Sequence, residues 1–212
     1  MALRITEIFH SLQGEASRVG LPTVFVRLTG CPLRCTWCDT TYSFTGGEAW
    51  TVDAVLAEVG RYPVRQVCVT GGEPLAQKDC LPLLSALCDA GYDVSLETSG
   101  ALDIAGVDPR VARIMDLKAP GSGESERNLW PNLAHLTTRD EIKIVIAARE
   151  DYDWAVSVLR EQALDQRCAV LFSPAQGQID PADLAAWILA DGLPVRFQMQ
   201  LHKILWGNRQ GC

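Results

Sequence analysis

The chain has 212 residues, of which 48% are hydrophobic and 21% charged, so it can bury one sizeable core as an ordinary globular protein does. A formal net charge of -7 argues against direct binding of nucleic acid through a broad basic surface. The first ten residues contain Arg4, Glu7 and His10 and no apolar signal-peptide core, and no apolar run approaches the ~20 residues of a membrane helix. We therefore expect a cytoplasmic protein that does not enter a membrane.

Strands and helices are expected to alternate along the chain. β-rich or apolar runs predict strands over residues 23–28, 66–70, 93–97, 113–117, 141–146, 169–172 and 195–199. Helical periodicity predicts helices over 51–59, 79–90, 152–163 and 181–190, with Thr51 as an N-cap and Gly91 as a C-terminal stop. Residues 119–130 are rich in Gly, Ser and Glu and predict a surface loop or lid.

This alternation indicates right-handed βαβ crossovers and a mainly parallel sheet. About six such units are too few for a closed eight-unit barrel, so the expected fold class is α/β, with a single domain over residues 1–212 built as a partial (βα)6-type barrel. Chemically unusual residues follow the predicted strands, at Cys31 and at 70–74, 97–100, 116–118 and 173–176. Since parallel strands end at one edge, these groups should meet at one mouth.

Three of the eight cysteines, Cys31, Cys35 and Cys38, lie within eight residues in a C-x3-C-x2-C arrangement. Thiolates this close can hold one metal centre. A structural zinc site normally needs a fourth Cys or His nearby, and the nearest downstream histidine is His135. Three thiolates leave one iron of a 4Fe–4S cluster open to a small molecule. The remaining cysteines are dispersed and are expected to be small core residues or, at the chain end, exposed: Cys68, Cys80, Cys88, Cys168 and Cys212.

The cysteine spacing resembles the signature of the radical S-adenosylmethionine superfamily. Trp37 stands at the aromatic position before the last cysteine, and Gly71-Gly72-Glu73-Pro74 resembles the motif that binds the methionyl amino group of S-adenosylmethionine. The resemblance implies a 4Fe–4S cluster held by the three cysteines and S-adenosylmethionine bound to its open iron. Cleavage of that cofactor would give a 5′-deoxyadenosyl radical that abstracts hydrogen from a substrate.

A longer pattern resembles the 7-carboxy-7-deazaguanine synthase family. It comprises Glu7-Ile-Phe-His-Ser-Leu-Gln-Gly-Glu15, Arg27-Leu-Thr-Gly-Cys31, Cys38-Asp-Thr40 and Gln200-Leu-His-Lys203. The resemblance implies conversion of 6-carboxy-5,6,7,8-tetrahydropterin to 7-carboxy-7-deazaguanine with loss of ammonia, on the way to queuosine and related deazapurines. It also implies a magnesium ion, regeneration of S-adenosylmethionine after each turnover, a flavodoxin- or ferredoxin-type electron donor and a homodimer.

The same resemblance assigns roles by position. Substrate contacts fall on Leu12, Gln13, Gly14, Arg27, Thr70, Glu97 and His202, and the magnesium ligand on Thr40. Contacts to S-adenosylmethionine fall on Trp37, Cys38, Asp39, Gly72, Ser99, Asp116, Leu117, Lys118, Ser173, Pro174, Ala175 and Gln176. An arginine fork suits the substrate carboxylate, and a glutamine can offer both donor and acceptor to a pterin ring.

Several of these residue types are also compatible with an ordinary structural role. Arg27 is compatible with a surface arginine on an edge strand, Glu97 with a capped turn and His202 with a core histidine. Lys118 is compatible with a solvated loop lysine, and Thr40 with a side-chain cap of the turn after the cysteines.

Two rival functions remain open at this point. An activase that installs a glycyl radical on a partner protein shares the C-x3-C-x2-C loop and an echo of Asp116-Leu-Lys118. Such an enzyme needs a wide groove, whereas a pterin needs a closed pocket, which the Leu12-Gln-Gly-Glu15 segment favours. The other rival, of a different class, is a zinc-stabilised interaction module without enzymatic activity.

Overall fold

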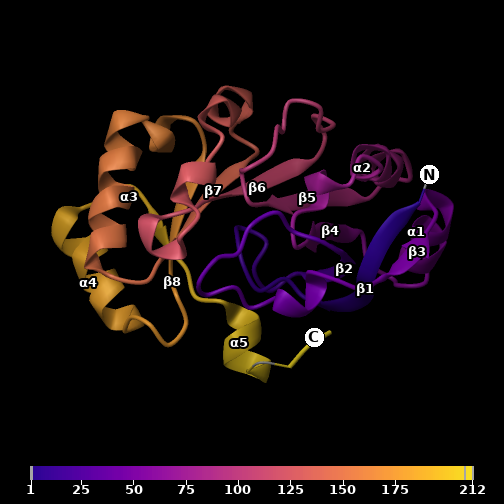
Figure 1. Ribbon diagram of the computed structural model, residues 1–212, viewed down its shortest axis with the longest axis horizontal. Coiled ribbons are helices and arrows are strands. Elements are labelled where there is room, and N and C mark those ends of the chain that lie inside the picture. Colours follow the sequence, from indigo (N-terminus) through magenta and orange to yellow (C-terminus); the bar gives the residue numbers. More distant parts are fainter. Residues whose placement is uncertain (1, 208, 212) are drawn as a thin grey trace.

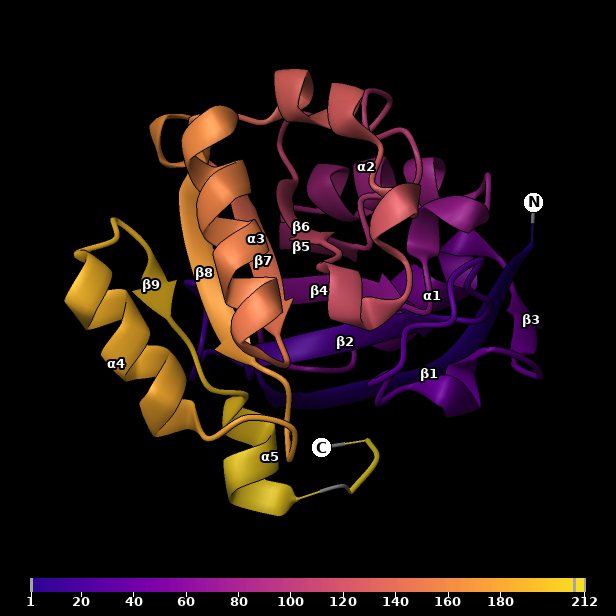
Figure 2. The same ribbon diagram turned by 60° about the vertical axis from the view of Figure 1, so that its left-hand side comes forward.

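The computed structural model describes residues 2–207 and 209–211. Its centre is an open sheet in which nine strands of these residues are ordered β3-β1-β2-β4-β5-β6-β7-β8-β9 (Figures 1 and 2). The strands are β1 Leu3–Leu12, β2 Pro22–Leu28, β3 Glu48–Trp50, β4 Gln66–Gly71, β5 Asp93–Thr98, β6 Ala112–Leu117, β7 Glu141–Ile146, β8 Ala169–Pro174 and β9 Arg196–Phe197.

The sheet is mainly parallel, as predicted. Strands β2 and β4 to β9 pair in parallel with their neighbours, whereas β1 pairs antiparallel with both β2 and β3. The sheet remains open, because β3 and β9 are separate edges. The predicted strand over 195–199 is shorter than expected, and β1 and β3 have no counterpart among the predicted strands. These findings confirm the α/β class. They also add β1 and β3, which the sequence did not predict, at one edge of the sheet.

Five α-helices lie within the described residues: α1 Val52–Val59, α2 Cys80–Asp89, α3 Arg149–Glu161, α4 Pro181–Asp191 and α5 Leu201–Trp206. The 3-10 helices are η1 Thr41–Ser43, η2 Pro74–Ala76, η3 Pro120–Ser122, η4 Ser125–Arg127, η5 Trp130–His135 and η6 Leu164–Gln166. The four predicted helices are confirmed, and α5 was not predicted. Thr51 caps α1 by accepting a 3.1 Å hydrogen bond from the Ala54 amide. Gly91, at φ +82°, follows α2 as expected.

The connections between the parallel strands do not all contain an α-helix. The connections after β5 and β6 contain loop and 3-10 turns in the described residues and no α-helix, so only part of the barrel-like unit has a helical outer layer. Helices α1 to α4 lie around the outside of the sheet, and the segment after β2 crosses its inner side (Figures 1 and 2). No helix in the described ranges is long and apolar enough to cross a membrane.

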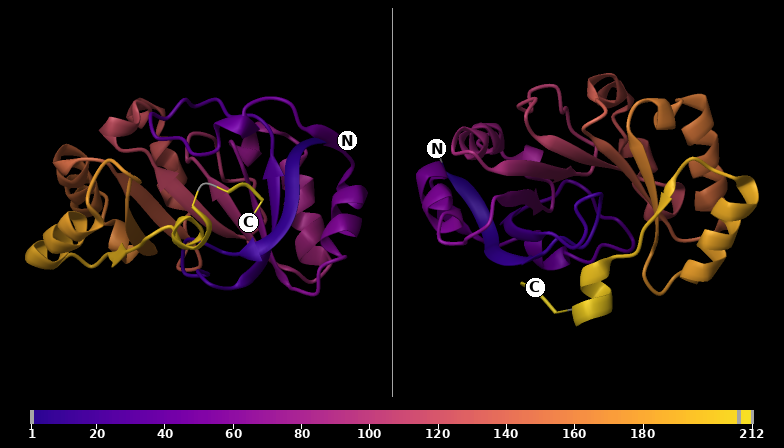
Figure 3. Two further views of the ribbon diagram at one scale, coloured as in Figure 1. Left: turned by 90° about the horizontal axis from the view of Figure 1, so that it is seen from below. Right: turned by 180° about the vertical axis from the view of Figure 1, so that it is seen from behind.

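Alternation along each strand separates the core from the inner face. On β2, Val24, Val26 and Leu28 are buried in the hydrophobic cluster that includes residues of α1 and α2. Phe25 and Arg27 point to the opposite side, into a cavity. Helix α5 lies at that side near the N-terminal half of the chain (Figure 3), where the Leu201 amide donates a 2.9 Å hydrogen bond to the Gly14 carbonyl.

Candidate functional site

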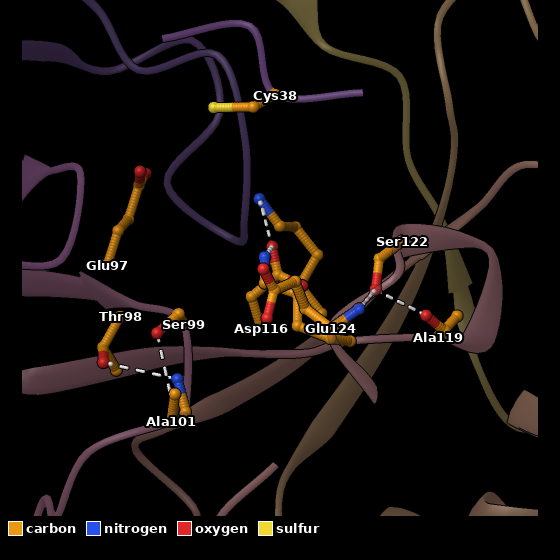
Figure 4. A network of polar contacts seen from close by, with 12 residues as sticks. Cys38, Glu97, Thr98, Ser99, Ala101, Asp116, Ala119, Ser122 and Glu124 are labelled. Atoms are coloured by element: carbon orange, nitrogen blue, oxygen red, sulfur yellow. Dashed lines mark hydrogen bonds and ion pairs between the residues drawn. The ribbon is translucent and has the colours of Figure 1, made fainter. Parts of the chain in front are cut away.

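A cavity of about 490 Å³ occupies the inner face and the carboxyl ends of the parallel strands. Its lining includes all but one of the residues that the sequence assigned to a site: Leu12, Gln13, Gly14, Arg27, Cys31, Cys35, Trp37, Cys38, Asp39, Thr40, Thr70, Gly72, Glu97, Ser99, Asp116, Lys118, Ser173, Pro174, Ala175, Gln176 and His202. Figure 4 shows Cys38, Glu97 and Asp116, from three different segments, around the same space. The expected convergence at one mouth is therefore seen.

Leu117 is the exception. Its side chain is 2% exposed and belongs to the hydrophobic core. Neighbouring residues on β6 point to opposite faces, so Asp116 and Lys118 reach the cavity while Leu117 packs behind the sheet. The Leu117 side chain therefore does not line the cavity, and the predicted contact of this residue to S-adenosylmethionine stays a prediction.

The cysteine loop is supported by residues 119–130, which were expected to form a surface loop or lid. The Thr36 amide donates a 3.0 Å hydrogen bond to the Ser122 carbonyl, and the Thr36 hydroxyl donates one of 2.8 Å to the Gly121 carbonyl. Gly121 is held in turn by Asp151 of α3, whose Oδ1 accepts its amide at 2.7 Å. The segment thus fixes the cysteine loop against α3.

The three cysteines of the loop lie at one cavity. Cys31, Cys35 and Cys38 are free and partly exposed at the cavity. Within the described residues no three Cys, His, Asp or Glu side chains are already grouped closely enough to hold one metal ion. In a 4Fe–4S cluster each thiolate binds a different iron, so the sulfurs stay apart. Burial raises the pKa of the Cys31 and Cys35 thiols, and metal binding would offset this by taking the thiolate.

The other cysteines behave as expected where they are described. Cys68, Cys80 and Cys168 are buried, and Cys88 is partly buried. Burial raises the pKa of the Cys80 thiol to about 12, so it stays protonated. Cys212 lies outside the described residues.

The glycine pair after β4 allows a close approach to the cluster loop. A Cβ on Gly72 would lie 2.3 Å from the Gly30 carbonyl oxygen and 2.7 Å from the Cys31 Cβ. A Cβ on Gly71 would lie 2.3 Å from the Leu28 carbonyl oxygen. Only glycine lets the end of β4 pass directly beneath Cys31.

Glu73 then fixes the neighbouring strand end. Its fully buried carboxylate accepts 3.0 Å hydrogen bonds from the Thr98 hydroxyl and one of 2.6 Å from the Ser99 amide. The Ser99 hydroxyl also donates to it. These bonds hold Ser99 at the cavity wall.

A polar network lines the part of the cavity between β1, β4 and β5. The Thr70 hydroxyl donates to Glu97 Oε2 at 3.0 Å, and Gln13 Nε2 donates to Glu97 Oε1 at 3.4 Å. Gln13 Oε1 accepts the Gly14 amide at 2.8 Å, which fixes the orientation of the side chain. Glu97 therefore serves this network and does not cap a turn.

Four further side chains lie at the cavity and not in the structural positions with which their residue types are also compatible. Arg27 is on an interior strand with 14% of its side chain exposed, so it is not a surface arginine. Lys118 is buried beside Asp116, with Nζ 3.0 Å from Oδ2, so it is not a solvated lysine. His202 lies at the cavity and not in the core, so close to Gly14 that a Cβ there would be 2.1 Å from His202 Nδ1. Thr40 precedes η1 without any side-chain cap hydrogen bond.

Sequence reasoning gave no site role to several cavity residues, among them the polar or charged Glu15, Lys143, Gln200 and Lys203. Lys143 Nζ lies 2.6 Å from Glu15 Oε2 and 3.6 Å from Asp116 Oδ2. Burial opposes its charge, but the carboxylates of Glu15 and Asp116 hold the Lys143 pKa well above its ordinary value. A lysine inside an apolar strand run, Glu141-Ile-Lys-Ile-Val-Ile146, was the signal that could have found it.

The cavity wall beside the cysteine loop has a polar atom that is free to bind a ligand. Asp116 Oδ1 is buried and has no hydrogen-bond partner among the described residues. A buried acceptor without a partner costs free energy unless a ligand supplies the donor. Asp116, Lys118 and Ser99 thus form a polar wall beside the cysteine loop that fits a polar cofactor such as S-adenosylmethionine.

Comparison with known proteins agrees with this geometry. Residues 25–161 match the family model of the Radical SAM superfamily. The 7-carboxy-7-deazaguanine synthase of Chlorobaculum tepidum is 47% identical over 207 residues, covering 96% of this chain and 94% of the relative. That of Koribacter versatilis is 44% identical over 219 residues, covering 96% and 97%.

Among solved structures, the crystal structure of QueE from Escherichia coli superposes with a TM-score of 0.77 at 27% identity, covering 95% of each chain. Similarity at these levels over nearly the full length also implies the 4Fe–4S cluster and the S-adenosylmethionine of the superfamily. The chain belongs to the 7-carboxy-7-deazaguanine synthase family of radical S-adenosylmethionine enzymes, which serve deazapurine biosynthesis.

Proposed function

We propose that this chain converts 6-carboxy-5,6,7,8-tetrahydropterin to 7-carboxy-7-deazaguanine with release of ammonia, a step toward queuosine or a related deazapurine. The observation that carries the proposal is one cavity that combines the cysteine loop, the Gln13–Glu97–Thr70 network and the charged Arg27. Its volume of about 490 Å³ lies within the ~300–1,000 Å³ of typical small-molecule sites. A cavity of this size suits a small molecule better than the partner protein of a glycyl-radical activase.

The cluster and S-adenosylmethionine, when bound, supply the radical that removes a hydrogen atom from the substrate. Cys31, Cys35 and Cys38 are the proposed cluster ligands. The polar wall of Asp116, Lys118 and Ser99 is proposed to hold S-adenosylmethionine, together with the segments 37–39, 72 and 173–176. These residues bind and orient the cofactor and exclude water from it.

The pterin ring is proposed to bind to Gln13, Thr70 and Glu97. A carboxylate and a side-chain amide together match the donors and acceptors on the edge of a pterin. Arg27 is proposed to pair with the substrate carboxylate, and His202 and the Leu12–Gly14 backbone to close the site from the C-terminal and N-terminal segments. Binding of this kind positions the reacting carbon near the cofactor.

Thr40 is proposed as the protein ligand of a magnesium ion. Its hydroxyl makes no cap hydrogen bond and is 3.8 Å from Cys38 Sγ. The adjacent Asp39 is paired with Lys203, whose Nζ is 2.8 Å from Oδ2. Magnesium accepts a few hard oxygens, with water and the substrate carboxylate completing the shell, so one hydroxyl is enough from the protein.

Three further features belong to the proposal, of which the family resemblance implies the first two. These are a homodimer, a flavodoxin- or ferredoxin-type electron donor and a cytoplasmic location. Gel filtration with light scattering, and reduction of the cluster by a flavodoxin, test the first two directly.

The experiment for the main proposal is anaerobic reconstitution followed by turnover. The purified chain should be brown, contain about four iron and four acid-labile sulfide per chain, and form 7-carboxy-7-deazaguanine from the carboxypterin. A colourless protein that holds zinc would identify the interaction module instead. Cleavage of S-adenosylmethionine without conversion of the carboxypterin would show that the proposed substrate is wrong.

A further inference from the structure

Glu7 lies directly opposite Arg27 because of an irregularity in β1. Ile5 pairs with Leu28, and a regular antiparallel ladder would then set Thr6 opposite Arg27. The register shifts between Ile5 and Glu7, so that Glu7 pairs with Arg27 instead. A bulge of this kind moves a side chain to the other face of a sheet. Here it leaves Ile5 in the core and brings the Glu7 carboxylate to the cavity-facing arginine.

One oxygen of Glu7 accepts from two side chains. Arg27 Nε donates to Oε1 at 2.7 Å, and the Tyr42 hydroxyl donates to the same oxygen at 2.8 Å. The Tyr42 phenol is thus a second donor on the same carboxylate oxygen that accepts from Arg27. Neither Glu7 nor Tyr42 lines the cavity, whereas Arg27 does. The two residues therefore stand behind the arginine.

The contacts of Arg27 leave one end of its guanidinium available. Within residues 2–207 and 209–211, only Nε of this side chain donates a hydrogen bond. The rings of Phe9 and Tyr42 flank it, with centroids 5.8 and 5.9 Å from Cζ. With Nε engaged and the plane held between rings, the Nη1 and Nη2 groups remain for a planar, bidentate acceptor.

We propose that Glu7 and Tyr42 are positioning residues that direct the Nη groups of Arg27 at the carboxylate of the substrate. This inference rests on the proposed function, which supplies the carboxylate. Without Glu7 the guanidinium would have to hold its orientation alone and would lose entropy on binding. A charged acceptor on Nε also keeps the arginine from turning back toward the protein.

The test is the dissociation constant of 6-carboxy-5,6,7,8-tetrahydropterin, measured by anaerobic calorimetry on the cluster-loaded enzyme with S-adenosylmethionine and no reductant. A tetrahydropterin without the carboxylate is the second probe. Glu7→Ala should weaken the carboxypterin by at least about tenfold, the scale of a charge-assisted contact, and leave the second probe almost unchanged. Glu7→Gln keeps an acceptor oxygen and should recover most of the affinity. Tyr42→Phe should also raise the dissociation constant of the carboxypterin, but by less than Glu7→Ala does.

The controls match these variants in chemistry. Glu48→Gln removes an exposed carboxylate of β3, and Tyr62→Phe removes a hydroxyl that makes no hydrogen bond within the described residues. Both should bind the two probes like the wild type. Arg27→Ala removes the whole guanidinium, so its loss of affinity for the carboxypterin is the largest expected and the reference for the other variants. Tyr42→Phe carries the test if Glu7→Ala does not fold.

Three outcomes overturn the inference. In the first, Arg27→Ala loses the carboxypterin while Glu7→Ala and Tyr42→Phe bind it like the wild type, which leaves the proposed function intact. In the second, Glu7→Ala weakens both probes equally, which indicates a structural role. In the third, the wild type binds neither probe, and the proposed substrate fails together with the inference.

Discussion

The ammonium of Lys143 on β7 lies 2.6 Å from the carboxylate of Glu15, a residue 128 positions earlier in the chain. The other oxygen of Glu15 accepts a 2.7 Å hydrogen bond from Gln200, so the beginning, middle and end of the chain meet across one cavity wall. Both charged side chains are nearly buried, with 13% and 11% exposed. The ion pair is thus part of the fold as well as of the site.

Removing one partner of this pair should be costly. Lys143→Met leaves the Glu15 carboxylate buried without its countercharge and should lower the free energy of unfolding by about 3 kcal/mol. The double variant Lys143→Met with Glu15→Gln should recover part of that loss, as measured by urea denaturation in a double-mutant cycle. Arg61→Met, which removes an exposed partner of Glu58, should leave the stability almost unchanged. Strictly additive single effects would contradict the coupling.

A second prediction concerns acid stability. Asp140 is buried, which by itself raises its pKa, but hydrogen bonds from Arg113 hold the pKa below its ordinary value. A depressed pKa in the folded state contributes stability that is complete above the unfolded value of about 4 and is lost as the pH falls through the folded value. Asp140→Asn should therefore destabilise the protein by about 3 kcal/mol at pH 7. The difference from the wild type should shrink below pH 4, and a difference independent of pH would contradict the assignment.

The cluster ligands can be separated from the other cysteines. Cys35→Ala should remove most of the brown absorbance of the reconstituted protein and all cleavage of S-adenosylmethionine. Cys68 is fully buried, and burial holds the pKa of its thiol well above the ordinary value, so Cys68→Ala should leave both intact. Iron analysis and product chromatography measure the two effects. A full cluster in Cys35→Ala would show that the ligand set is wrong.

Much of the fold and of the cavity followed from local patterns. The apolar runs of β2 and β4 to β8 and the caps at Thr51 and Gly91 are properties of neighbouring residues, which periodicity captures. Family resemblance placed Arg27, Glu97 and Asp116 in one site, and all three line the cavity.

Other features depend on contacts between distant segments. Strand β1 alternates poorly, because the bulge after Ile5 changes which face its residues occupy. The direction of Lys143 is set by Glu15 and Asp116, and the position of α5 by Asp39 and Gly14. No local pattern contains these pairings. The same limit explains Leu117, which the resemblance assigned as part of a segment although alternation on β6 turns it to the core.

Magnesium dependence tests the role of Thr40. If magnesium joins Thr40 to the substrate carboxylate, withholding it should slow formation of 7-carboxy-7-deazaguanine while cofactor cleavage without substrate continues. Thr40→Ala should show the same phenotype, and Thr40→Ser, which keeps the hydroxyl, should partly restore activity. Product formation is measured against magnesium concentration for each protein. An identical magnesium response in the wild type and Thr40→Ala would remove the metal role from this residue.

The measurement that tests the central claim most directly is the stoichiometry of turnover by the reconstituted chain. With carboxypterin, a reductant and magnesium, and with S-adenosylmethionine limiting, 7-carboxy-7-deazaguanine and ammonia should form in equal amounts. Because the cofactor is regenerated in the proposed reaction, each product should exceed the S-adenosylmethionine supplied. Cleavage of S-adenosylmethionine to 5′-deoxyadenosine with no 7-carboxy-7-deazaguanine, in a protein with a complete cluster, would contradict the claim.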